Sequence, residues 1–235
     1  MITSWEALPD MFPGLVDSES WVPRLQAHAA FLASAAPRVK TTSVDPAEMI
    51  GRHYAESLEL LRLLDAAGVG PPLVDVGPGG GFPGLVIAAV RPDWPITLVE
   101  PLKKRAKLLE DAAAEMGLRH AAVAALRAEE AGRSPLRETA AVVTARAVAP
   151  LPELLEYCAP LAAVGGLLAF PKGHGWQQEL DSAAGAMKEL GCSLEAEVEM
   201  RSAVSATPIV LLVRKTATTA ERYPRRPGIP RKRPL

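Results

Sequence analysis

The segment from Leu73 to Gly84, which reads LVDVGPGGGFPG, decides the fold of this chain. Its apolar start, Leu73 to Val76, has the length and composition of a buried strand, and Leu85 to Val90 can begin a helix. Between them lies a cluster of glycines that includes Gly77 and Gly79. Glycine permits positive φ and lets the backbone approach a ligand closely. The segment therefore predicts a strand, a tight loop and a helix, the turn that cradles a nucleotide in an α/β sheet.

Two cofactors compete for this turn. Gly79-x-Gly81-x-x-Gly84 matches the dinucleotide pattern, but the match begins beyond the strand end and Pro83 interrupts it. Asp75 is the better indication, because its charge is awkward beside a pyrophosphate and suits the cationic amino-acid end of S-adenosylmethionine. An acid followed by spaced glycines after a first strand is typical of methyltransferases that use this cofactor. We favour a methyl-donor site, and the alternative is a glycine-rich connection that binds nothing.

Composition is that of an ordinary globular protein. The chain has 235 residues, 49% of them hydrophobic, and a formal net charge of −1, which allows a substantial core and gives no global field for binding nucleic acid. The two cysteines form no motif, so we expect buried, reduced thiols. No signal peptide or membrane-spanning stretch is visible. We expect a cytoplasmic monomer that binds neither membrane, DNA nor metal.

The order of helical and strand-like segments divides the chain into three parts. Residues 1–70 read as a helical extension, residues 71–215 as a sheet domain and residues 216–235 as a basic tail. Strands alternate with helices in the middle part, and its last two strands are too close together for a helical crossover. We predict a Rossmann-like, mostly parallel sheet of about seven strands, closed by an antiparallel pair.

The boundaries of the expected elements follow from capping residues, prolines and apolar runs. Residues 1 to 16 look irregular, and one continuous helix is expected from about Pro46 to Ala67. Further helices are expected over Asp17 to Ala36, Lys103 to Met116, Pro150 to Ala163 and Gly175 to Leu190, and later strands over Ile96 to Val99, Ala121 to Ala125, Ala140 to Thr144, Leu167 to Phe170, Leu194 to Met200 and Pro208 to Val213.

Several polar residues follow the ends of these strands, where ligands bind in open α/β sheets. Glu100 ends the second strand and can accept hydrogen bonds from both ribose hydroxyls of an adenosine cofactor, whether methyl donor or nicotinamide. In a methyltransferase, the backbone at Ala128 and the side chain of Glu129 would meet the adenine. Arg146 follows the fourth strand, in a position to touch cofactor or substrate, and Lys172 follows the fifth.

The tail after Glu221 combines arginine with proline and contains no acid. Proline predicts an extended segment that cannot pack as a helix. Two interpretations stay open: a disordered, solubilising end, or an arm that contacts phosphates through arginines such as Arg225 and Arg226.

These motifs together resemble one family, the bacterial methyltransferases that modify a guanine at N7 in small-subunit (16S) ribosomal RNA, also called the glucose-inhibited division protein B family. The similarity runs from about Val39 to the C-terminus. Its pieces are Thr42-Ser43-Val44, Arg52-His53-x-x-x-Ser57, the Asp75 to Gly84 loop, Lys104-Arg105, Arg127-Ala-Glu129, Thr144-Ala-Arg-Ala147, Lys172-Gly173 and the ending from Tyr223 to Leu235.

The resemblance implies that Gly77, Phe82, Ala128, Glu129 and Arg146 contact S-adenosylmethionine. The chain departs from the family pattern where Val148 replaces a common aromatic residue and Pro171 a leucine, at the place where the family would hold the guanine.

Transfer to guanine N7 requires no general base, because that nitrogen has a free lone pair at neutral pH. Alignment supplies most of the catalysis, so Arg146 is expected to position the base or the cofactor. Residues expected to hold RNA phosphates are Arg52, His53, Lys103, Lys104, Lys172 and the tail arginines, although a histidine such as His53 is as often an ordinary helix residue. The RNA would be a small-subunit ribosomal RNA or an assembling particle, with its target base unpaired.

Other chemistries fit less well. Methylation of an exocyclic amine usually uses an Asn- or Asp-Pro-Pro-aromatic segment where this chain has Thr144 to Val148, and pyrimidine C5 methylation needs a cysteine at the ligand edge. A small-molecule methyltransferase, a non-catalytic ribosome-associated module and a nicotinamide dehydrogenase remain as alternatives.

Overall fold

The computed structural model describes residues 4–37, 39, 44–201 and 209–235. Part of the Thr42-Ser43-Val44 motif and the expected strand start at Pro208 lie outside the described residues.

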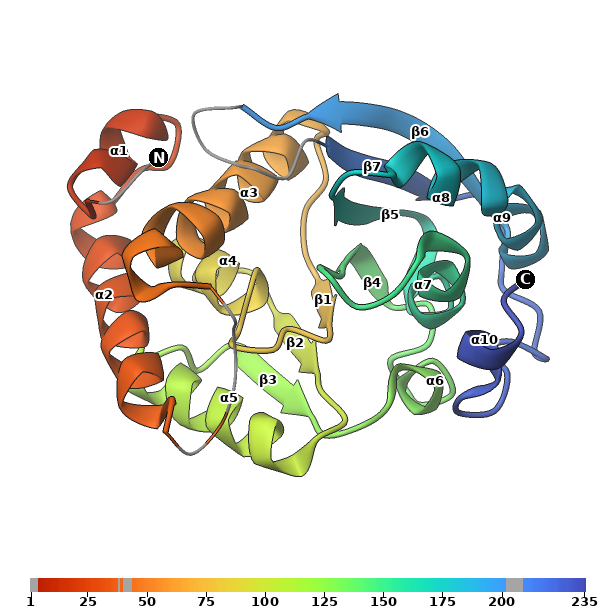
Figure 1. The fold of residues 1–235 in the computed structure, drawn as a ribbon, viewed down its shortest axis with the longest axis horizontal. Helices are drawn as coiled ribbons and strands as arrows, with labels where there is room; N and C mark the ends of the chain where they lie inside the picture. Colours follow the sequence, from red (N-terminus) through yellow and green to blue (C-terminus); the bar gives the residue numbers. More distant parts are fainter. Residues whose placement is uncertain (1–3, 38, 40–43, 202–208) are drawn as a thin grey trace.

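The described residues form one seven-stranded sheet with the order β3-β2-β1-β4-β5-β7-β6 (Figure 1). β7 is antiparallel to both of its neighbours, and the other pairs are parallel. The strands are β1 (Leu73–Val76), β2 (Ile96–Val99), β3 (Ala121–Ala124), β4 (Ala140–Thr144), β5 (Ala162–Lys172), β6 (Cys192–Glu199) and β7 (Ile209–Lys215). The predicted Rossmann-like fold and its closing antiparallel pair are confirmed.

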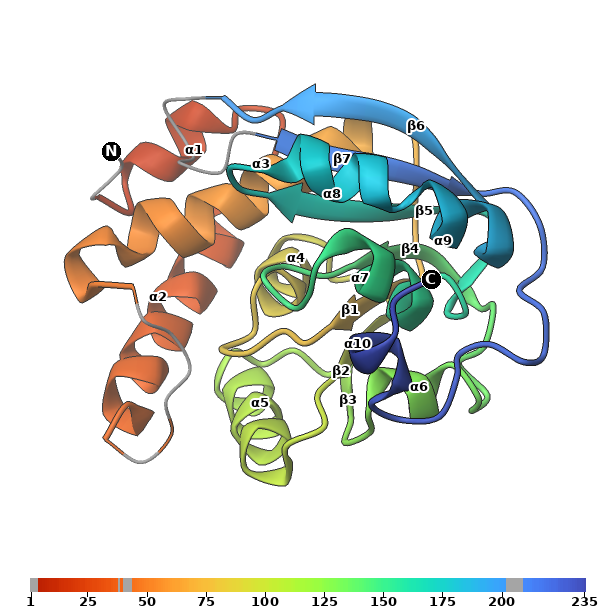
Figure 2. The same cartoon turned by 45° about the vertical axis from the view of Figure 1, so that its right-hand side comes forward.

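Helices cover both faces of the sheet, with the N-terminal helices on one side and the later helices on the other (Figures 1 and 2). The helical elements are α1 (Ala7–Met11), α2 (Ser18–Ala35), η1 (Pro46–Glu48), η2 (Ile50–Ala55), α3 (Glu56–Ala66), α4 (Gly84–Val90), α5 (Lys103–Glu115), α6 (Ala128–Ala131), α7 (Leu151–Cys158), α8 (Trp176–Ser182), α9 (Ala184–Leu190) and α10 (Ile229–Lys232).

Side chains alternate between the two faces of the buried strands and pack into two hydrophobic cores, one on each face of the sheet. Leu73 of β1 faces the core formed with α2, α3, α4 and α5, whereas Val74 and Val76 face the core formed with α7 and α9. Successive side chains of a strand point to opposite faces, so a strand covered on both sides is apolar throughout. Asp75 is the exception in β1, since it is a fully buried acid on the α4 side.

The strand order reverses between β1 and β4, because the chain runs outward to β3 and then returns to the other side of β1. At such a switch point the loops after the two strands diverge and leave room for a ligand. The glycine loop after β1 and the segment Ala145 to Pro150 after β4 meet at this edge.

The N-terminal part differs from the prediction in two places. Residues expected to be irregular contain α1, whose Leu8 is fully buried. The helix expected from Pro46 to Ala67 is divided into η1, η2 and α3, and η2 is a π-helix. A π-helix adds a residue to a turn and redirects the side chains that follow, which local propensity does not reveal.

The middle of the chain also contains corrections. β5 begins before Gly165 and extends through Pro171 and Lys172, so these last two residues lie inside the strand. α7 is correspondingly shorter than expected, and the helix expected from Gly175 breaks at Ala183 into α8 and α9. Pairing with β7 at Pro171 and Lys172, and with β4 at Ala162, stabilises the two extensions of the strand.

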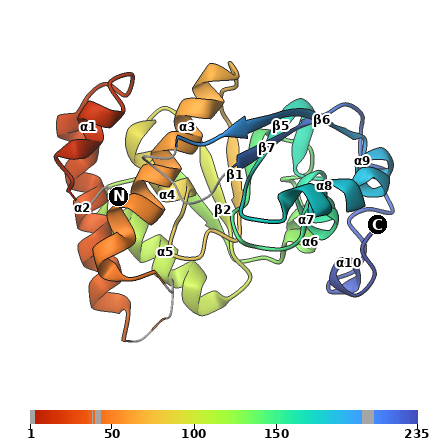
Figure 3. The same cartoon turned by 45° about the horizontal axis from the view of Figure 1, so that its top comes forward.

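The prediction that the tail cannot pack as a helix was wrong. The tail folds back beside α6 and α7 and forms α10, on the opposite side of the molecule from α2 (Figure 3). Gly228 precedes this helix with φ +80°, and Pro230 occupies its first turn, where a missing N–H removes no helical hydrogen bond.

Candidate cofactor and RNA site

The glycine loop is shaped by close backbone contacts. Gly77 has φ +68°, its amide donates to the carbonyl of Val99 at 2.9 Å, and a Cβ atom there would meet Val148 at 2.8 Å. At Gly84 a Cβ atom would meet Leu98 at 2.3 Å. Side chains at these positions would collide with the neighbouring strand and with the loop after β4, which is the physical reason for the glycines.

A cleft of about 630 Å³ opens at the carboxyl ends of β1 and β2. It brings together Gly77, Glu100, Ala128 and Glu129, four of the residues proposed from the sequence. Its volume lies in the usual range for cofactor pockets. The sequence reasoning did not anticipate that Tyr157, Gly228 and Arg231 also line it. Gly79, with φ +58°, is not among the lining residues.

Two buried carboxylates of the cleft differ in their partners. Glu100 accepts a hydrogen bond from the amide of Leu102 at 3.0 Å, and Glu129 accepts one from the amide of Gly228 at 2.9 Å. In both cases one carboxylate oxygen is used and the other forms no hydrogen bond to the described residues. These oxygens are acceptors, and the ribose hydroxyls and adenine amino group of S-adenosylmethionine are donors. The acceptor oxygens of this cleft therefore fit the donors of the cofactor.

Asp75 lies on the other face of β1. Its Oδ2 accepts the amide of Gly84 at 2.7 Å, whereas Oδ1 is buried and, like the hydroxyl of neighbouring Thr144, has no hydrogen-bond partner among the described residues. Burial raises the pKa of Asp75 to about 7, although the Gly84 amide, the nearby Thr144 hydroxyl and the charge of Arg146 oppose this shift. Asp75 thus fixes the start of α4 behind the glycine loop, and it does not line the cleft.

Arg146 turns away from the cleft toward the helical extension. Its guanidinium donates to Glu56 at 3.1 Å, to the carbonyl of Arg52 at 3.1 Å and to His53 Nδ1 at 2.8 Å. It also lies 5.6 Å from the centre of the Phe82 ring. We call the group Glu56, His53, Phe82 and Arg146 the arginine cluster. The sequence placed Phe82 and Arg146 on the cofactor, whereas neither lines the cleft.

The protonation state of His53 follows from this geometry. Burial and the adjacent Arg146 guanidinium lower the pKa of His53 to about 3, so its ring is neutral at neutral pH. Its Nδ1 must then accept the hydrogen bond, since an arginine can only donate. The ring is also stacked on Phe82, with centroids 4.5 Å apart.

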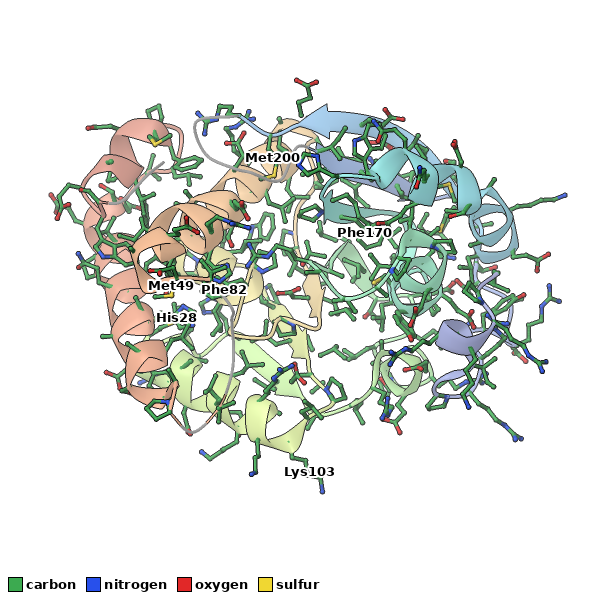
Figure 4. The ribbon with its side chains drawn as sticks, viewed as in Figure 1. His28, Met49, Phe82, Lys103, Phe170 and Met200 are labelled. Atoms are coloured by element: carbon green, nitrogen blue, oxygen red, sulfur yellow. The ribbon has the colours of Figure 1, made fainter. Side chains whose placement is uncertain are left out.

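His28 holds the glycine loop from α2, a role that the sequence reasoning missed. Its Nε2 lies 2.9 Å from the carbonyl of Gly80, and Tyr54 Oη lies 3.1 Å from its Nδ1. Because the carbonyl can only accept, Nε2 carries the proton and Nδ1 accepts from the tyrosine. Burial lowers the pKa of His28 to about 4. Figure 4 shows His28 beside Phe82 on this side of the molecule, and their ring centroids are 5.2 Å apart.

A second hollow, of about 350 Å³, shares the Ala147–Pro150 segment with the cleft as a lining. Arg146, Pro171 and Lys172 line it, and Val148 lines both hollows. Ala147 has φ +55°, a left-handed conformation that is unfavourable for alanine and that the surrounding contacts must maintain.

The residues expected to bind RNA fall into two groups. Lys172 donates to Glu179 at 2.7 Å and to the carbonyl of Ala149 at 3.1 Å, and Arg225 forms a two-pronged pair with the buried Glu156. These two side chains, like His53, are engaged inside the protein. The other group has exposed or half-exposed side chains and consists of Arg52, Lys103, Lys104 and Arg226. Arg52 lies 3.7 Å from Glu48, and Lys103 points into solvent in Figure 4.

The two thiols offer no nucleophile to the cleft. Cys158 and Cys192 are free and buried, as expected, and burial raises the pKa of both above the usual thiol range. Within the described ranges, no three acids, histidines or cysteines gather as metal ligands. Nor does any helix in the part of the chain that the structure describes have the length and apolarity to cross a membrane.

The fold is that of the class I, S-adenosylmethionine-dependent methyltransferases, and the acceptors of the cleft fit the same cofactor. The solved structures agree with the fold: cofactor-bound Rv0187 from MTB superposes with a TM-score of 0.60 at 15% identity, covering 92% of this chain and 99% of that chain. A mutant of MtNAS in complex with S-adenosylmethionine gives a TM-score of 0.58 at 15% identity, covering 92% and 85%.

The sequence comparison narrows the class to a family. The sequence model of GidB, described as rRNA small subunit methyltransferase G, matches residues 22–204. The chain is similar to three proteins named Ribosomal RNA small subunit methyltransferase G. The protein from Pelotomaculum thermopropionicum is 36% identical, and the alignment covers 94% of each chain. The protein from Symbiobacterium thermophilum is 41% identical over 83% of this chain and 82% of the relative, and the protein from Roseiflexus castenholzii is 37% identical over 99% of this chain and 96% of the relative.

The chain belongs to the GidB family of rRNA small subunit methyltransferases. It is an enzyme that methylates small-subunit ribosomal RNA with S-adenosylmethionine, as the resemblance in its sequence implied.

Proposed function

We propose that the protein transfers a methyl group to N7 of a guanine in 16S ribosomal RNA, at the border between the cleft and the hollow beside Arg146. The observation that carries this proposal is their adjacency: the cleft of Glu100 and Glu129 and the hollow of Arg146 and Lys172 share the Ala147–Pro150 segment as a lining. A methyl donor in one and an acceptor base in the other would lie close together, and proximity supplies much of the barrier reduction in such a transfer.

The cleft residues hold the cofactor in this proposal. The unpaired oxygen of Glu100 accepts hydrogen bonds from ribose hydroxyls, the backbone at Ala128 pairs with the adenine edge, and Glu129 accepts from the adenine amino group. Gly77 allows the chain of the methionine portion to lie against the backbone. S-adenosylmethionine, when bound, supplies an electrophilic methyl group on a sulfonium.

Arg146 positions the base. Guanine N7 has a free lone pair, so the residues around it need to orient the ring and need not remove a proton. Glu56 and the neutral His53 accept hydrogen bonds from Arg146 and thereby fix the direction of its guanidinium. The helical extension thus contributes to the reaction through Arg146, and we propose that residues 1–70 act with the sheet domain as one catalytic unit.

Accessible cations support a place for the RNA. Arg52, Lys103 and Arg226 have exposed or half-exposed side chains, so they are the contacts that we propose for phosphates. Lys172 and Arg225 are engaged in internal ion pairs, and we assign them no RNA contact. The cytoplasmic location, the monomeric state and the division at residues 70 and 215 stay predictions.

The decisive experiment uses labelled S-adenosylmethionine and small-subunit particles that lack their N7-methylguanine, followed by nucleoside analysis. We expect label in N7-methylguanine alone. Label in another nucleoside would contradict the choice of atom, and binding of cofactor without any labelled RNA would favour a non-catalytic module.

A further inference from the structure

We propose that the C-terminal tail forms the outer wall of the cofactor cleft and sets its preference for adenine. This inference rests on the proposed function, because it assumes that adenine lies at the Ala128–Glu129 end of the cleft. The residues that carry it are Gly228, which positions Glu129, and Arg231, which lines the cleft.

The tail is anchored to the segment that follows the adenine end of the cleft. Arg133 donates to the carbonyl of Pro224 through two nitrogens, at 3.0 and 2.6 Å, and Arg137 donates to the carbonyl of Tyr223 at 2.9 Å. Gly132 makes this approach possible, since a Cβ atom there would meet Pro224 at 3.0 Å. The tail therefore stays beside α6, the short helix that contains Glu129.

A buried ion pair fixes the next part of the tail. Glu156 of α7 is fully buried. Its carboxylate accepts hydrogen bonds from the backbone amide of Arg225 at 2.7 Å and from the guanidinium of Arg225 at 2.6 Å. The same guanidinium donates to the carbonyl of Arg233 at 2.7 Å, which closes the tail on itself around α10. An arginine engaged in this way holds the tail in place and is not available to RNA.

These anchors bring Gly228 and α10 to the cleft. The Gly228 amide occupies Oε1 of Glu129 at 2.9 Å and leaves Oε2 without a hydrogen bond to the described residues. An ionised carboxylate accepts only, so the free oxygen selects a ligand edge that carries a donor, such as the 6-amino group of adenine. A purine with a 6-oxo group would present an acceptor to it and be rejected. Arg231 adds a planar cation that can stack on a purine face.

The exposed neighbours on α10 offer a matched comparison. Arg231 and Lys232 are adjacent, cationic and exposed, but only Arg231 lines the cleft. Replacing either removes one positive charge from the same helix. If Arg231→Ala weakens cofactor binding and Lys232→Ala does not, Arg231 acts as a wall of the cleft. Equal weakening would show a general effect of basic charge.

The test measures binding of S-adenosylhomocysteine and S-inosylhomocysteine by calorimetry to the full chain and to a chain that ends at Pro227. We expect the full chain to bind S-adenosylhomocysteine at least about tenfold more tightly than S-inosylhomocysteine, because the inosine compound loses a hydrogen bond to the charged Glu129 side chain. The shortened chain should bind it about tenfold more weakly and lose most of the preference. Arg231→Ala should weaken binding about threefold or more, and Lys232→Ala should leave it unchanged.

The outcomes distinguish the inference from the proposed function. A full chain that shows no preference between the two compounds contradicts the adenine assignment itself. A shortened, folded chain that keeps both affinity and preference overturns the inference, and a raised KM for ribosomal particles in that variant would identify the tail as an RNA arm. If the shortened chain does not fold, equal effects of Arg231→Ala and Lys232→Ala overturn it.

Discussion

The cofactor cleft and the arginine cluster lie on either side of the glycine loop, and they treat their polar groups differently. In the cleft, Glu100 and Glu129 each leave one oxygen without a hydrogen bond to the described residues. In the cluster, Arg146 donates to three acceptors, and the nearby His28 uses both ring nitrogens. The cleft carboxylates keep acceptors for a ligand, whereas Arg146 and His28 are hydrogen-bonded within the protein.

This difference assigns the two regions different work. Buried polar groups cost free energy unless they are hydrogen-bonded, so a partly satisfied cleft gains when a ligand completes it. A satisfied network gains nothing from a ligand, but it holds a side chain in one direction. We therefore expect changes in the cleft to alter cofactor affinity and changes in the cluster to alter turnover or stability.

The largest effect should come from Arg146. Arg146→Ala removes the positioning cation, and misplacement of a reacting group costs about a hundredfold or more in rate. Labelled transfer to particles at saturating cofactor measures this loss, and Arg119→Ala, an exposed arginine before β3, is the control. Affinity for S-adenosylhomocysteine should stay within about threefold, because Arg146 does not line the cleft. Strong loss of that affinity would remove the distinction between the two regions.

Acid should destabilise the cluster side of the loop. The pKa of His28 in the fold is about 4, below the usual 6.5, so its contribution is present above pH 6.5 and is lost as pH falls toward 4. His53, with a pKa of about 3, acts in the same direction, and Asp75, with a pKa raised to about 7, acts in the opposite one.

Between pH 4.5 and 6, His28, His53 and Asp75 together take up about one proton when the chain unfolds. The free energy of unfolding contributed by these three groups therefore falls by about 1.4 kcal/mol for each pH unit of acidification. Urea unfolding over this range measures the slope. In His28→Gln the slope should be smaller by about 1.4 kcal/mol per pH unit, because the variant lacks the proton that His28 takes up on unfolding. An unchanged slope would show that His28 is already protonated in the fold.

A smaller effect, on affinity alone, is expected at Glu100. Glu100→Ala removes the acceptor for the ribose hydroxyls and should raise the Kd for S-adenosylmethionine by about ten- to a hundredfold. Equilibrium dialysis measures the change, with the exposed Glu110→Ala as control. The rate at saturating cofactor should change little. A Kd equal to that of the unaltered protein would place the ribose elsewhere.

The smallest effect tests the clamp on the glycine loop. Tyr54→Phe deletes the donor to His28 Nδ1 and leaves that buried nitrogen unpaired, which should cost about 1–2 kcal/mol of unfolding free energy. Chemical denaturation gives this value, and Ser34→Ala, which removes an exposed hydroxyl of α2, should cost less than about 0.5 kcal/mol. Equal costs for the two variants would argue against the clamp.

Local patterns were sufficient for the class of sheet and for four residues that line the cleft. The apolar run at Leu73 to Val76, the glycines after it and the acid at the end of β2 are all contiguous features whose meaning depends on chain geometry nearby. The carboxyl ends of parallel strands lie at one edge of a sheet. The sequence could therefore predict that Gly77, Glu100, Ala128 and Glu129 lie close together, as they do in the cleft.

Contacts between distant segments decided the rest. Arg146 looked like a ligand residue because of its place after β4, but its direction depends on Glu56, 90 positions earlier. Arg225 looked like part of an RNA arm, yet the buried Glu156 lies 69 positions before it and draws the tail onto the cleft. The sequence by itself determined the order of the strands and their loops, because strand, loop and cap preferences are local, and the family motifs along it indicated the cofactor. Only the tertiary structure decided which charges are free, because a side chain's partner is a matter of packing in space.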